Sequence, residues 1–563
     1  MEKPVFKLKP VPEDLLFLSL ILGAAVLMAW PLFSNSLLDA HDSIAYYSKA
    51  VAVHQSWREG DFLARWSPHI NQGYGYPNLN FYSPLFFYIA ASCMFFFPLV
   101  LGFHVAIFVC LFLSGVSMYF FARELWGRQG GLLSSVAYLF APYHALDIYM
   151  RAAVGEATAF IFFPLILLAF YRLSRGVVLR DILIGVFGVA GLFLSHPLAT
   201  FIFLPWAVGY GLFLWAAAGR FEVRKLMAMG FVFGGALWVT AYFVLPSMLE
   251  QPFVHIERFL NIDYRENFLR LGHVFYAPWK FRGASAREAI VPGEVHLLAV
   301  LVLLLFWRRI VLTVKGAGRQ MLFFLALFIL AIFFTLPVSA PCWRIIPKLA
   351  YVQFPWRFMM LAALSLSFLS GGVICLFSPR LRKVALFLGC ILFICFNLSY
   401  CRVFYLKIHE TRSTEAYVRT LKSHESGGFV PKWVENGRIL SPAKKVQVTR
   451  GEAQVVEEGG SPLDRRFHVT AATLATLCFY SYYFPGWEVF VNGRATEIYP
   501  SNPFGLILFK VPPGDSSVRV HFGTTPVRQW GEILSLSSVL FLALIMIFRK
   551  RVDAWLAGGA PPM

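Results

Sequence analysis

Apolar runs of the length needed to cross a lipid bilayer recur along the whole chain, and this feature limits the possible folds more than any other. A helix that spans the hydrocarbon core needs about 17–25 residues. Hydrophobic residues make up 58% of the 563 residues and charged residues only 14%, whereas soluble domains carry about 25% charged residues. A soluble enzyme is therefore excluded. The runs cover residues 15–33, 82–100, 103–121, 131–143, 157–171, 182–196, 199–217, 227–246, 295–307, 320–338, 357–377, 384–400 and 530–548.

Basic residues cluster in five short connections between these runs and indicate the orientation of the chain. Arginine and lysine collect in the cytoplasmic loops of membrane proteins, so we predict that these connections and both termini are cytoplasmic. The excess of 50 Lys and Arg over 31 Asp and Glu then records orientation, and we expect no nucleic-acid partner. The cations are Arg172, Arg175 and Arg180; Arg220, Arg224 and Lys225; Arg308, Arg309, Lys315 and Arg319; Arg380, Arg382 and Lys383; and Arg549, Lys550 and Arg551.

Thirteen crossings would leave the two termini on opposite faces, so one run must fall short of a full crossing. The best candidates lie between residues 81 and 143, where Pro77, Pro84, Pro98 and Gly102 interrupt the pattern and the run from Gly131 to Phe140 is short. A re-entrant segment is permitted there if it is buried in protein or lines a polar cavity. We therefore predict a polytopic α-helical membrane protein of about 12–13 transmembrane helices, with residues 1–401 as its multi-pass domain. Its external loops are predicted at residues 34–80, 142–157 and 247–294.

Residues 402–528 differ from the rest of the chain in charge and in pattern. They include 16 Lys and Arg and 11 Asp and Glu, too many for a segment in lipid. Stretches of alternating polarity, such as Trp487 to Val491 and Val518 to Phe522, predict strands, and Asn492-Gly493 predicts a hairpin turn. We therefore predict an external β-sandwich domain, followed at residues 529–563 by a final transmembrane helix and a short cytoplasmic tail.

Two carboxylates and an imidazole follow the first predicted crossing in Asp39-Ala40-His41-Asp42. A carboxylate held at a fixed depth, where water is limited, can act as a general base or bind a metal-bound phosphate. The alternative is a hydrated turn beside the membrane, which explains any one of these residues equally well. Because Asp39, His41 and Asp42 occur together, we predict a catalytic site there, and whether it uses a divalent metal stays open.

Further along the same loop, Arg65, Trp66 and Tyr76 offer a cation and two aromatic rings. Rings of this kind can pack against a sugar. The alternative is an aromatic belt that anchors the next helix at the membrane interface. We treat the three residues as candidates for substrate binding and give them no catalytic role.

A second polar cluster falls in the next external loop. His144, Asp147 and Arg151 are spaced to share one face of a helix, and Glu156 follows. The alternative is an internal ion pair at the membrane edge. Arginine suits phosphate because its planar guanidinium donates two hydrogen bonds at once and stays charged. Arg357, at the start of a later crossing, could hold a lipid-linked phosphate or simply reach ordinary lipid headgroups.

The loop motifs and the order of elements resemble known membrane families. Gly60-Asp61 through Arg65-Trp66-Ser67-Pro68 and Gly73-Tyr74-Gly75-Tyr76-Pro77 resemble the bacterial membrane family labelled "6-pyruvoyl-tetrahydropterin synthase-related", whose label implies no pterin chemistry. Tyr482-Tyr483-Phe484-Pro485-Gly486-Trp487 looks like the β-domain of related membrane proteins that glycosylate cell-wall polymers. The architecture resembles the GT-C superfamily of integral-membrane glycosyltransferases, which use polyprenyl-phosphate-linked sugars.

The GT-C resemblance implies roles for the candidate residues. In these enzymes an Asp of the first external loop acts as, or stands near, the base that deprotonates the acceptor, and the matching position here is Asp42, with Asp39 as its rival. Asp147 or Glu156 matches the second-loop acid of the same site. This sequence lacks a clean Asp-x-Asp motif, so the use of a metal stays open.

The resemblance predicts a glycosyltransferase of the inner membrane that moves one sugar from a polyprenyl-phosphate donor to an envelope glycan, lipid or protein on the external face. Asp42 would activate the acceptor hydroxyl, and Arg151 and Arg357 would neutralise the departing phosphate. The alternative is a non-enzymatic membrane protein, either a transporter or an assembly scaffold whose β-domain binds a glycan or a partner. A transporter is expected to carry functional charges near the middle of its crossings, whereas here the polar clusters lie at the external ends.

Overall fold

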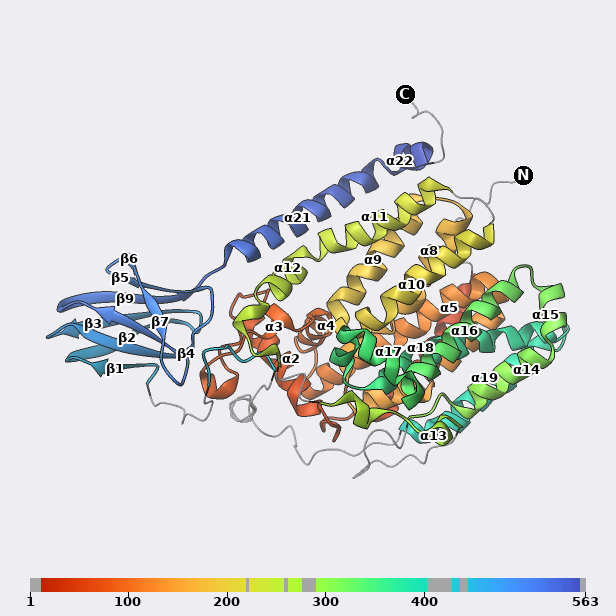
Figure 1. Cartoon of the computed structure of the whole chain (residues 1–563), viewed down its shortest axis with the longest axis horizontal. Coiled ribbons are helices and arrows are strands. Elements are labelled where there is room, and N and C mark those ends of the chain that lie inside the picture. Colours follow the sequence, from red (N-terminus) through yellow and green to blue (C-terminus); the bar gives the residue numbers. More distant parts are fainter. Residues whose placement is uncertain are drawn as a thin grey trace.

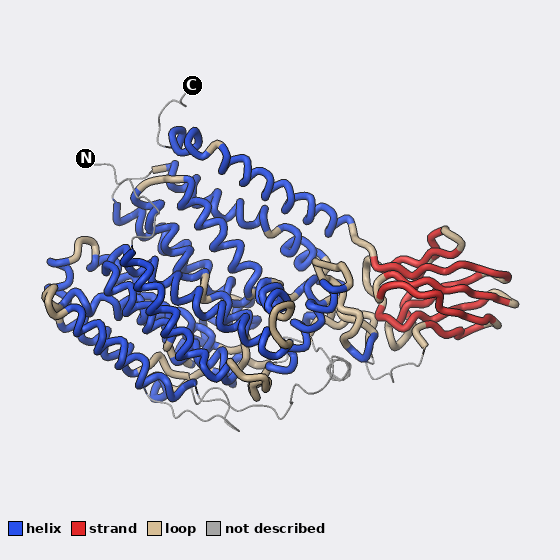
Figure 2. The backbone as a smooth tube through the Cα atoms, turned by 180° about the vertical axis from the view of Figure 1, so that it is seen from behind, coloured by secondary structure: helices blue, strands red, loops and turns tan. Residues whose placement is uncertain are grey.

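The computed structural model describes residues 12–218, 222–257, 262–275, 290–401, 428–435 and 444–556. They form a helical bundle with a β-domain standing beyond one end of it (Figure 1). The view from behind shows the strands gathered in that domain and the long helices gathered in the bundle (Figure 2). The predicted fold class is therefore confirmed. Parts of the predictions concern residues outside this described set, namely Arg220 and residues 402–427 and 436–443.

Most of the apolar runs form helices, and residues suited to helix ends bound several of them. Pro197 begins one helix, and Gly176 follows another that ends in Arg175. The helices are α1 (Pro12–Ala29), α2 (Ser43–Arg58), α3 (Asn78–Phe81), α4 (Leu85–Cys93), α5 (Leu99–Leu139), α6 (Pro142–Ala145), α7 (Val154–Ala159), α8 (Phe162–Arg175), α9 (Leu179–Ser195), α10 (Pro197–Ala218), α11 (Val223–Val239), α12 (Ala241–Leu249), α13 (Leu271–Phe275), α14 (Glu294–Leu305), α15 (Trp307–Thr313), α16 (Ala317–Thr335), α17 (Ala340–Ile345), α18 (Met359–Ser370), α19 (Arg382–Asn397), α21 (Pro526–Ile547) and α22 (Arg549–Leu556).

The predicted run at residues 82–100 falls short of a crossing. Its helix, α4, has nine residues, so it is about 13 Å long and covers less than half of the hydrocarbon core. Pro84 precedes α4, and Pro98 separates it from α5. The expectation that one run between residues 81 and 143 is interrupted is met at this helix.

Within the described residues, eight helices are long and apolar enough to cross a bilayer, or ten if each of two pairs bent by 75° forms one span. α5 consists of two limbs, because it reverses at Gly127, whose φ of +72° suits glycine. Ser135 on the second limb donates a hydrogen bond to the Gly115 carbonyl on the first. α9, with 17 residues, returns along α8.

The cytoplasmic side of the prediction corresponds to the end of the bundle away from the β-domain. α15 and α22, which carry two of the basic clusters, lie there (Figure 1). Asp14, in the first turn of α1, lies 3.1 Å from both Arg123 and Arg128, on either side of the reversal in α5. The start of α1 and this reversal are therefore at the same end of the bundle.

The β-domain is a sandwich of two antiparallel sheets with the strand orders β1-β4-β8-β7 and β2-β3-β9-β5-β6. The predicted strands around Trp487 and Val518 are confirmed, and Asn492 and Gly493 turn the hairpin with φ of +51° and +77°. α21 begins at Pro526, slightly before the predicted boundary. The strands are β1 (Val446–Arg450), β2 (Ala453–Ser461), β3 (Asp464–Ala471), β4 (Ala475–Tyr482), β5 (Trp487–Val491), β6 (Arg494–Thr496), β7 (Ile498–Pro500), β8 (Leu506–Val511) and β9 (Gly514–Phe522).

Candidate active site

Two arginines and two carboxylates pair with one another at the end of the bundle opposite the basic connections. Arg151 Nη1 contacts Asp147 Oδ1 and lies 3.1 Å from Glu156 Oε2. Glu156 also accepts a hydrogen bond of 2.5 Å from Tyr143 Oη and lies 3.6 Å from Arg357 Nε. All five side chains are buried. Tyr143, Asp147, Arg151, Glu156 and Arg357 are called the charge cluster below.

The backbone that carries most of the charge cluster departs from regular helix. Leu146–Met150 forms a π-helical turn, and Ala152 has a φ of +53°, which few L-residues adopt. Such features are frequent at functional sites. His144, predicted to share a helix face with the cluster, is directed elsewhere, because its Nδ1 lies 3.3 Å from the Tyr138 carbonyl oxygen and its ring stacks on Phe160.

The first loop, predicted to be external, lies against the charge cluster through its backbone. The His41 N–H donates to the Met150 carbonyl and the Asp42 N–H donates to the Arg151 carbonyl, both at 3.0 Å. Asp42 precedes α2, yet its carboxylate does not cap that helix and is exposed. The structure thus brings Asp42 beside the segment of Arg151, although the two residues are more than 100 positions apart in the sequence.

Burial and mutual charge set the protonation of the cluster. Burial, with help from the charge of Glu156, raises the pKa of Asp147 well above its usual range, against the pull of Arg151. Burial alone would lower the pKa of Arg151, but the negative charges of Glu156 and Asp147 outweigh this effect. The pKa of Arg151 is therefore raised above its usual value, and the guanidinium stays charged. Asp147 Oδ2 is buried and accepts no hydrogen bond from the residues that the structure describes. The cluster thus combines the guanidinium groups of Arg151 and Arg357 with the carboxyl group of Asp147, which holds its proton to higher pH than usual. This combination of groups suits an anionic ligand.

A lysine on α2, not among the predicted site residues, adds a further charge. Lys49 Nζ lies 3.8 Å from the centre of the Tyr82 ring, and Tyr82 donates a hydrogen bond of 2.6 Å to Tyr46. Burial lowers the pKa of Lys49 to about 8, although the negative charge of Asp42 opposes this shift. The signal was present in the spacing, since Asp42, Tyr46 and Lys49 stand at i, i+4 and i+7 on one helical face.

A histidine from the α9–α10 connection stands next to the cluster. His196 packs against Gly155, where an added Cβ would lie 3.3 Å from its ring. Its Nδ1 accepts a hydrogen bond of 3.1 Å from the Ala199 N–H, so the neutral ring carries its proton on Nε2. Burial lowers the pKa of His196 to about 4. Nothing in the local sequence around His196 connects it with Glu156, so the sequence alone does not mark it as a site residue.

Three predicted substrate-binding residues lie at the contact between the first loop and the C-terminal part of the chain. Trp66 is fully buried among aromatic rings of the β-domain. Arg65 Nη2 lies 2.9 Å from Glu532 on α21, and Tyr76 Oη accepts a hydrogen bond of 3.0 Å from the Phe429 N–H. These side chains hold the loop in place, and the structure does not bring them together with the charge cluster.

The described residues do not contain a group of three His, Cys, Asp or Glu side chains placed to hold a metal ion. Asp147 and Glu156 face arginines, which occupy the position that a metal would need. Asp39 is half-buried, and His41 and Asp42 are exposed, in the first loop. The two carboxylates of the charge cluster are therefore paired with arginines and are not arranged around a common metal position.

Comparison with known proteins assigns the chain to a family. Residues 79–403, more than half of the chain, match the family described as "6-pyruvoyl-tetrahydropterin synthase related domain; membrane protein". The chain belongs to this family. The matched region contains the whole charge cluster, whereas Asp42 and the first loop up to residue 78 lie before it. The predicted family and the membrane location are thereby confirmed.

Individual relatives are more distant. An uncharacterized protein of Lactococcus lactis subsp. cremoris (strain MG1363) is 25% identical over 260 residues, which make up 45% of this chain and 42% of that protein. The chain thus spans less than half of the relative's length. Two solved structures are similar at 13% identity. These are the arabinofuranosyltransferase AftD from Mycobacteria, with a TM-score of 0.44 over 70% of this chain and 27% of AftD, and the Archaeoglobus fulgidus oligosaccharyltransferase, with a TM-score of 0.41 over 73% of this chain and 57% of that one.

Proposed function

We propose that this membrane protein is a glycosyltransferase that moves a sugar from a polyprenyl-phosphate donor to an acceptor of the cell envelope. The observation that carries the proposal is the pair of backbone hydrogen bonds from His41 and Asp42 to residues 150 and 151. They bring an exposed carboxylate beside a buried, arginine-containing cluster. A base next to cations is the arrangement that transfer from a phosphate leaving group requires.

The proposed reaction is a single displacement. The Asp42 carboxylate takes the proton of an acceptor hydroxyl, and the acceptor oxygen forms a bond to the anomeric carbon of the sugar. The bond from that carbon to the phosphate oxygen breaks, and its electron pair leaves with the polyprenyl phosphate. Arg151 and Arg357 stabilise the charge that develops on this phosphate, because a guanidinium can donate two parallel hydrogen bonds to it.

The position of the charge cluster supports a donor that is anchored in lipid. Glu156 lies near the start of a span whose other end carries Arg172 and Arg175, and Arg357 begins a span that ends before Arg380. The cluster is therefore at the end of the bundle opposite the basic connections. With those connections in the cytoplasm, the reaction takes place at the external face of the inner membrane, where a polyprenyl chain can lie in the bilayer and its phosphate can reach the cluster.

The proposal is tested with the full-length protein in lipid nanodiscs. Synthetic undecaprenyl-phosphate-linked hexoses and pentoses are supplied with a cell-envelope extract, and the release of undecaprenyl phosphate is measured by mass spectrometry. Asp42→Asn removes the base while preserving side-chain size, so release should fall by about 100-fold or more. The wild-type thermal unfolding temperature should be retained, because Asp42 is exposed and does not cap α2.

Asp39→Asn is the matched control from the same loop and should keep most of the activity. Full activity in Asp42→Asn, or a loss confined to Asp39→Asn, would contradict the role assigned to Asp42. Movement of intact labelled donor across proteoliposomes, unchanged by Asp42→Asn, would favour a transporter instead.

A further inference from the structure

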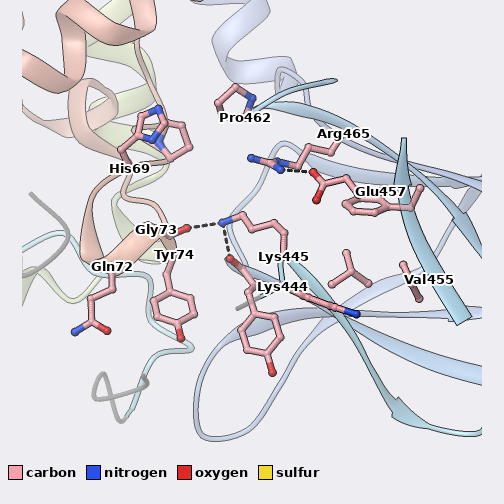
Figure 3. A pocket seen from close by; sticks show the side chains of 14 residues that line it. His69, Gln72, Gly73, Tyr74, Lys444, Lys445, Val455, Glu457, Pro462 and Arg465 are labelled. Carbon is pink, nitrogen blue, oxygen red and sulfur yellow. Dashed lines mark hydrogen bonds and ion pairs between the residues drawn. The ribbon is translucent and has the colours of Figure 1, made fainter. Parts of the chain in front are cut away.

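A cleft of about 520 Å³ separates the first external loop from one edge of the β-sandwich (Figure 3). Pro68, His69 and residues 72–74 of the loop line one side, and residues of β1, β2, β3 and β4 line the other. This volume is within the range of small-ligand sites, about 300–1,000 Å³. The lining residues are distinct from the charge cluster, so the cleft is separate from it.

Positive charge exceeds negative charge in the cleft. Lys444, Lys445 and Arg465 line it, and Glu457 is the one carboxylate among the lining residues. Arg465 pairs with Glu457 (Figure 3), which engages one of the five N–H donors of the guanidinium. Arg465 Nε is buried and has no hydrogen-bond partner in the described part of the chain. The exposed Lys444 adds a second cation.

The two sides of the cleft are fastened to each other. Lys445 Nζ donates hydrogen bonds to the Gly73 carbonyl at 2.5 Å and to the Tyr480 carbonyl at 2.8 Å (Figure 3). The Tyr482 N–H donates to the Tyr74 carbonyl at 2.8 Å. The cleft is therefore formed before any ligand arrives, which reduces the entropy that binding would cost.

Backbone strain marks the loop side of the cleft. Asn71 and Gln72 have φ of +54° and +57° in succession, and Gly73 follows at +90°. Consecutive left-handed residues that are not glycine cost about 1–3 kcal/mol each and are found where packing or function holds them. They turn the loop so that Gln72 and Gly73 line the cleft together.

An aromatic ring completes the lining on the sheet side. Tyr480 is half-buried, and its hydroxyl donates a hydrogen bond of 2.8 Å to Gln447, which fixes the ring. Such a ring offers a flat apolar surface beside polar groups. The combination of a fixed ring and paired cations suits a flat, hydroxyl-rich ligand that carries negative charge.

We infer that this cleft binds an anionic saccharide, such as a phosphate- or uronate-bearing segment of an envelope polymer. The inference rests on the proposed function, since it assigns to the β-domain the task of holding the acceptor polymer while transfer occurs at the charge cluster. Arg465 and Lys444 bind the acidic groups, and Tyr480 packs against a sugar ring. A volume of about 520 Å³ accommodates one or two sugar residues.

Binding is measured without any transfer reaction, so that the two proposals can fail separately. Fluorescent oligogalacturonate and oligo(glycerol phosphate) are titrated into the full-length protein in phosphatidylcholine nanodiscs, with fluorescent dextran as the neutral probe. We expect at least one anionic probe to bind more tightly than dextran and to weaken as salt is added. The double variant Lys444→Gln/Arg465→Gln should bind that probe about tenfold or more weakly.

The matched control removes two exposed cations of the same domain outside the cleft, in Lys510→Gln/Arg494→Gln, and should bind like the wild type. Asp42→Asn should also bind normally, which separates this site from the transfer site. Equal loss in both double variants, or equal binding of dextran, would overturn the inference. Displacement of the glycan by phosphatidylglycerol in the nanodisc would also overturn it and would assign the cleft to lipid headgroups.

Discussion

Arg528 joins three parts of the chain, and its removal is predicted to open the junction between the bundle and the β-domain. The side chain is fully buried at the start of α21. Its Nε and Nη2 lie 3.1 and 2.9 Å from Glu250 Oε2, at the end of α12, and Nη2 donates to the Pro485 carbonyl at 3.0 Å. Glu250 also accepts hydrogen bonds from Asn80 in the first loop and from Thr525.

Arg528→Met leaves the Glu250 carboxylate buried without its main counter-charge. Breaking a buried ion pair in this way costs about 3–5 kcal/mol. Since 1.4 kcal/mol corresponds to a factor of ten, the population of the open junction should rise by about 100-fold or more. A second substitution, Glu250→Gln, removes the stranded charge, so the double variant should recover a large part of the loss.

Hydrogen–deuterium exchange of the protein in nanodiscs measures this opening in peptides that cover residues 66–82 and 484–491. Arg519→Met is the control, because Arg519 pairs with Asp464 on the exposed surface of the same domain and should cost less than about 1 kcal/mol. Unchanged exchange at the junction in Arg528→Met would refute the reasoning. The same holds if the increase in exchange of the double variant equals the sum of the increases in the two single variants.

Two further predictions concern the first loop and α2. Gly75→Ala should destabilise the junction by about 1–3 kcal/mol more than Gly73→Ala, because both glycines have φ of +90° but only a Cβ at Gly75 would meet the Trp66 indole, at 2.4 Å. Thermal unfolding of the two variants checks this, and equal losses would contradict it. Lys49, whose pKa burial lowers from 10.5 to about 8, binds its proton less tightly in the folded chain, so stability should rise with pH between these values relative to Lys49→Met. Unfolding temperatures at about pH 7.5 and about pH 9.5 test the sign, and a constant difference would contradict it.

Much of the candidate site could be read from residue type and spacing. Asp147 and Arg151 are four positions apart, so a helical turn brings them together even when its form is π rather than α. Asp42 was identified because it follows a crossing, and Arg357 because it begins one. The pairing of Glu156 with Arg357 could not be read in this way, because the two residues are about 200 positions apart and meet only through the packing of their spans.

Other candidate residues belonged to sequence patterns that are typical of two different roles. Trp66 and Tyr76 looked like sugar-binding aromatics or like membrane anchors, and their partners belong to the distant C-terminal part of the chain. An aromatic residue carries no local mark that distinguishes a ligand from a packing partner, since both bury the same apolar surface. Lys49 was not predicted, because its spacing from Asp42 and Tyr46 places the three residues on one helical face but does not show that aromatic rings surround the lysine.

The amino-acid sequence alone predicts the helical membrane domain, the interrupted run at residues 82–100 and the β-sandwich. These properties follow from the composition and period of neighbouring residues, which set how each segment meets lipid or water. The tertiary structure alone decided that the first loop lies on residues 150 and 151, that Glu156 is shared by two arginines, and that a basic cleft forms where the loop meets the β-domain. Such contacts depend on which distant surfaces fit together, and no local pattern along the chain records that fit.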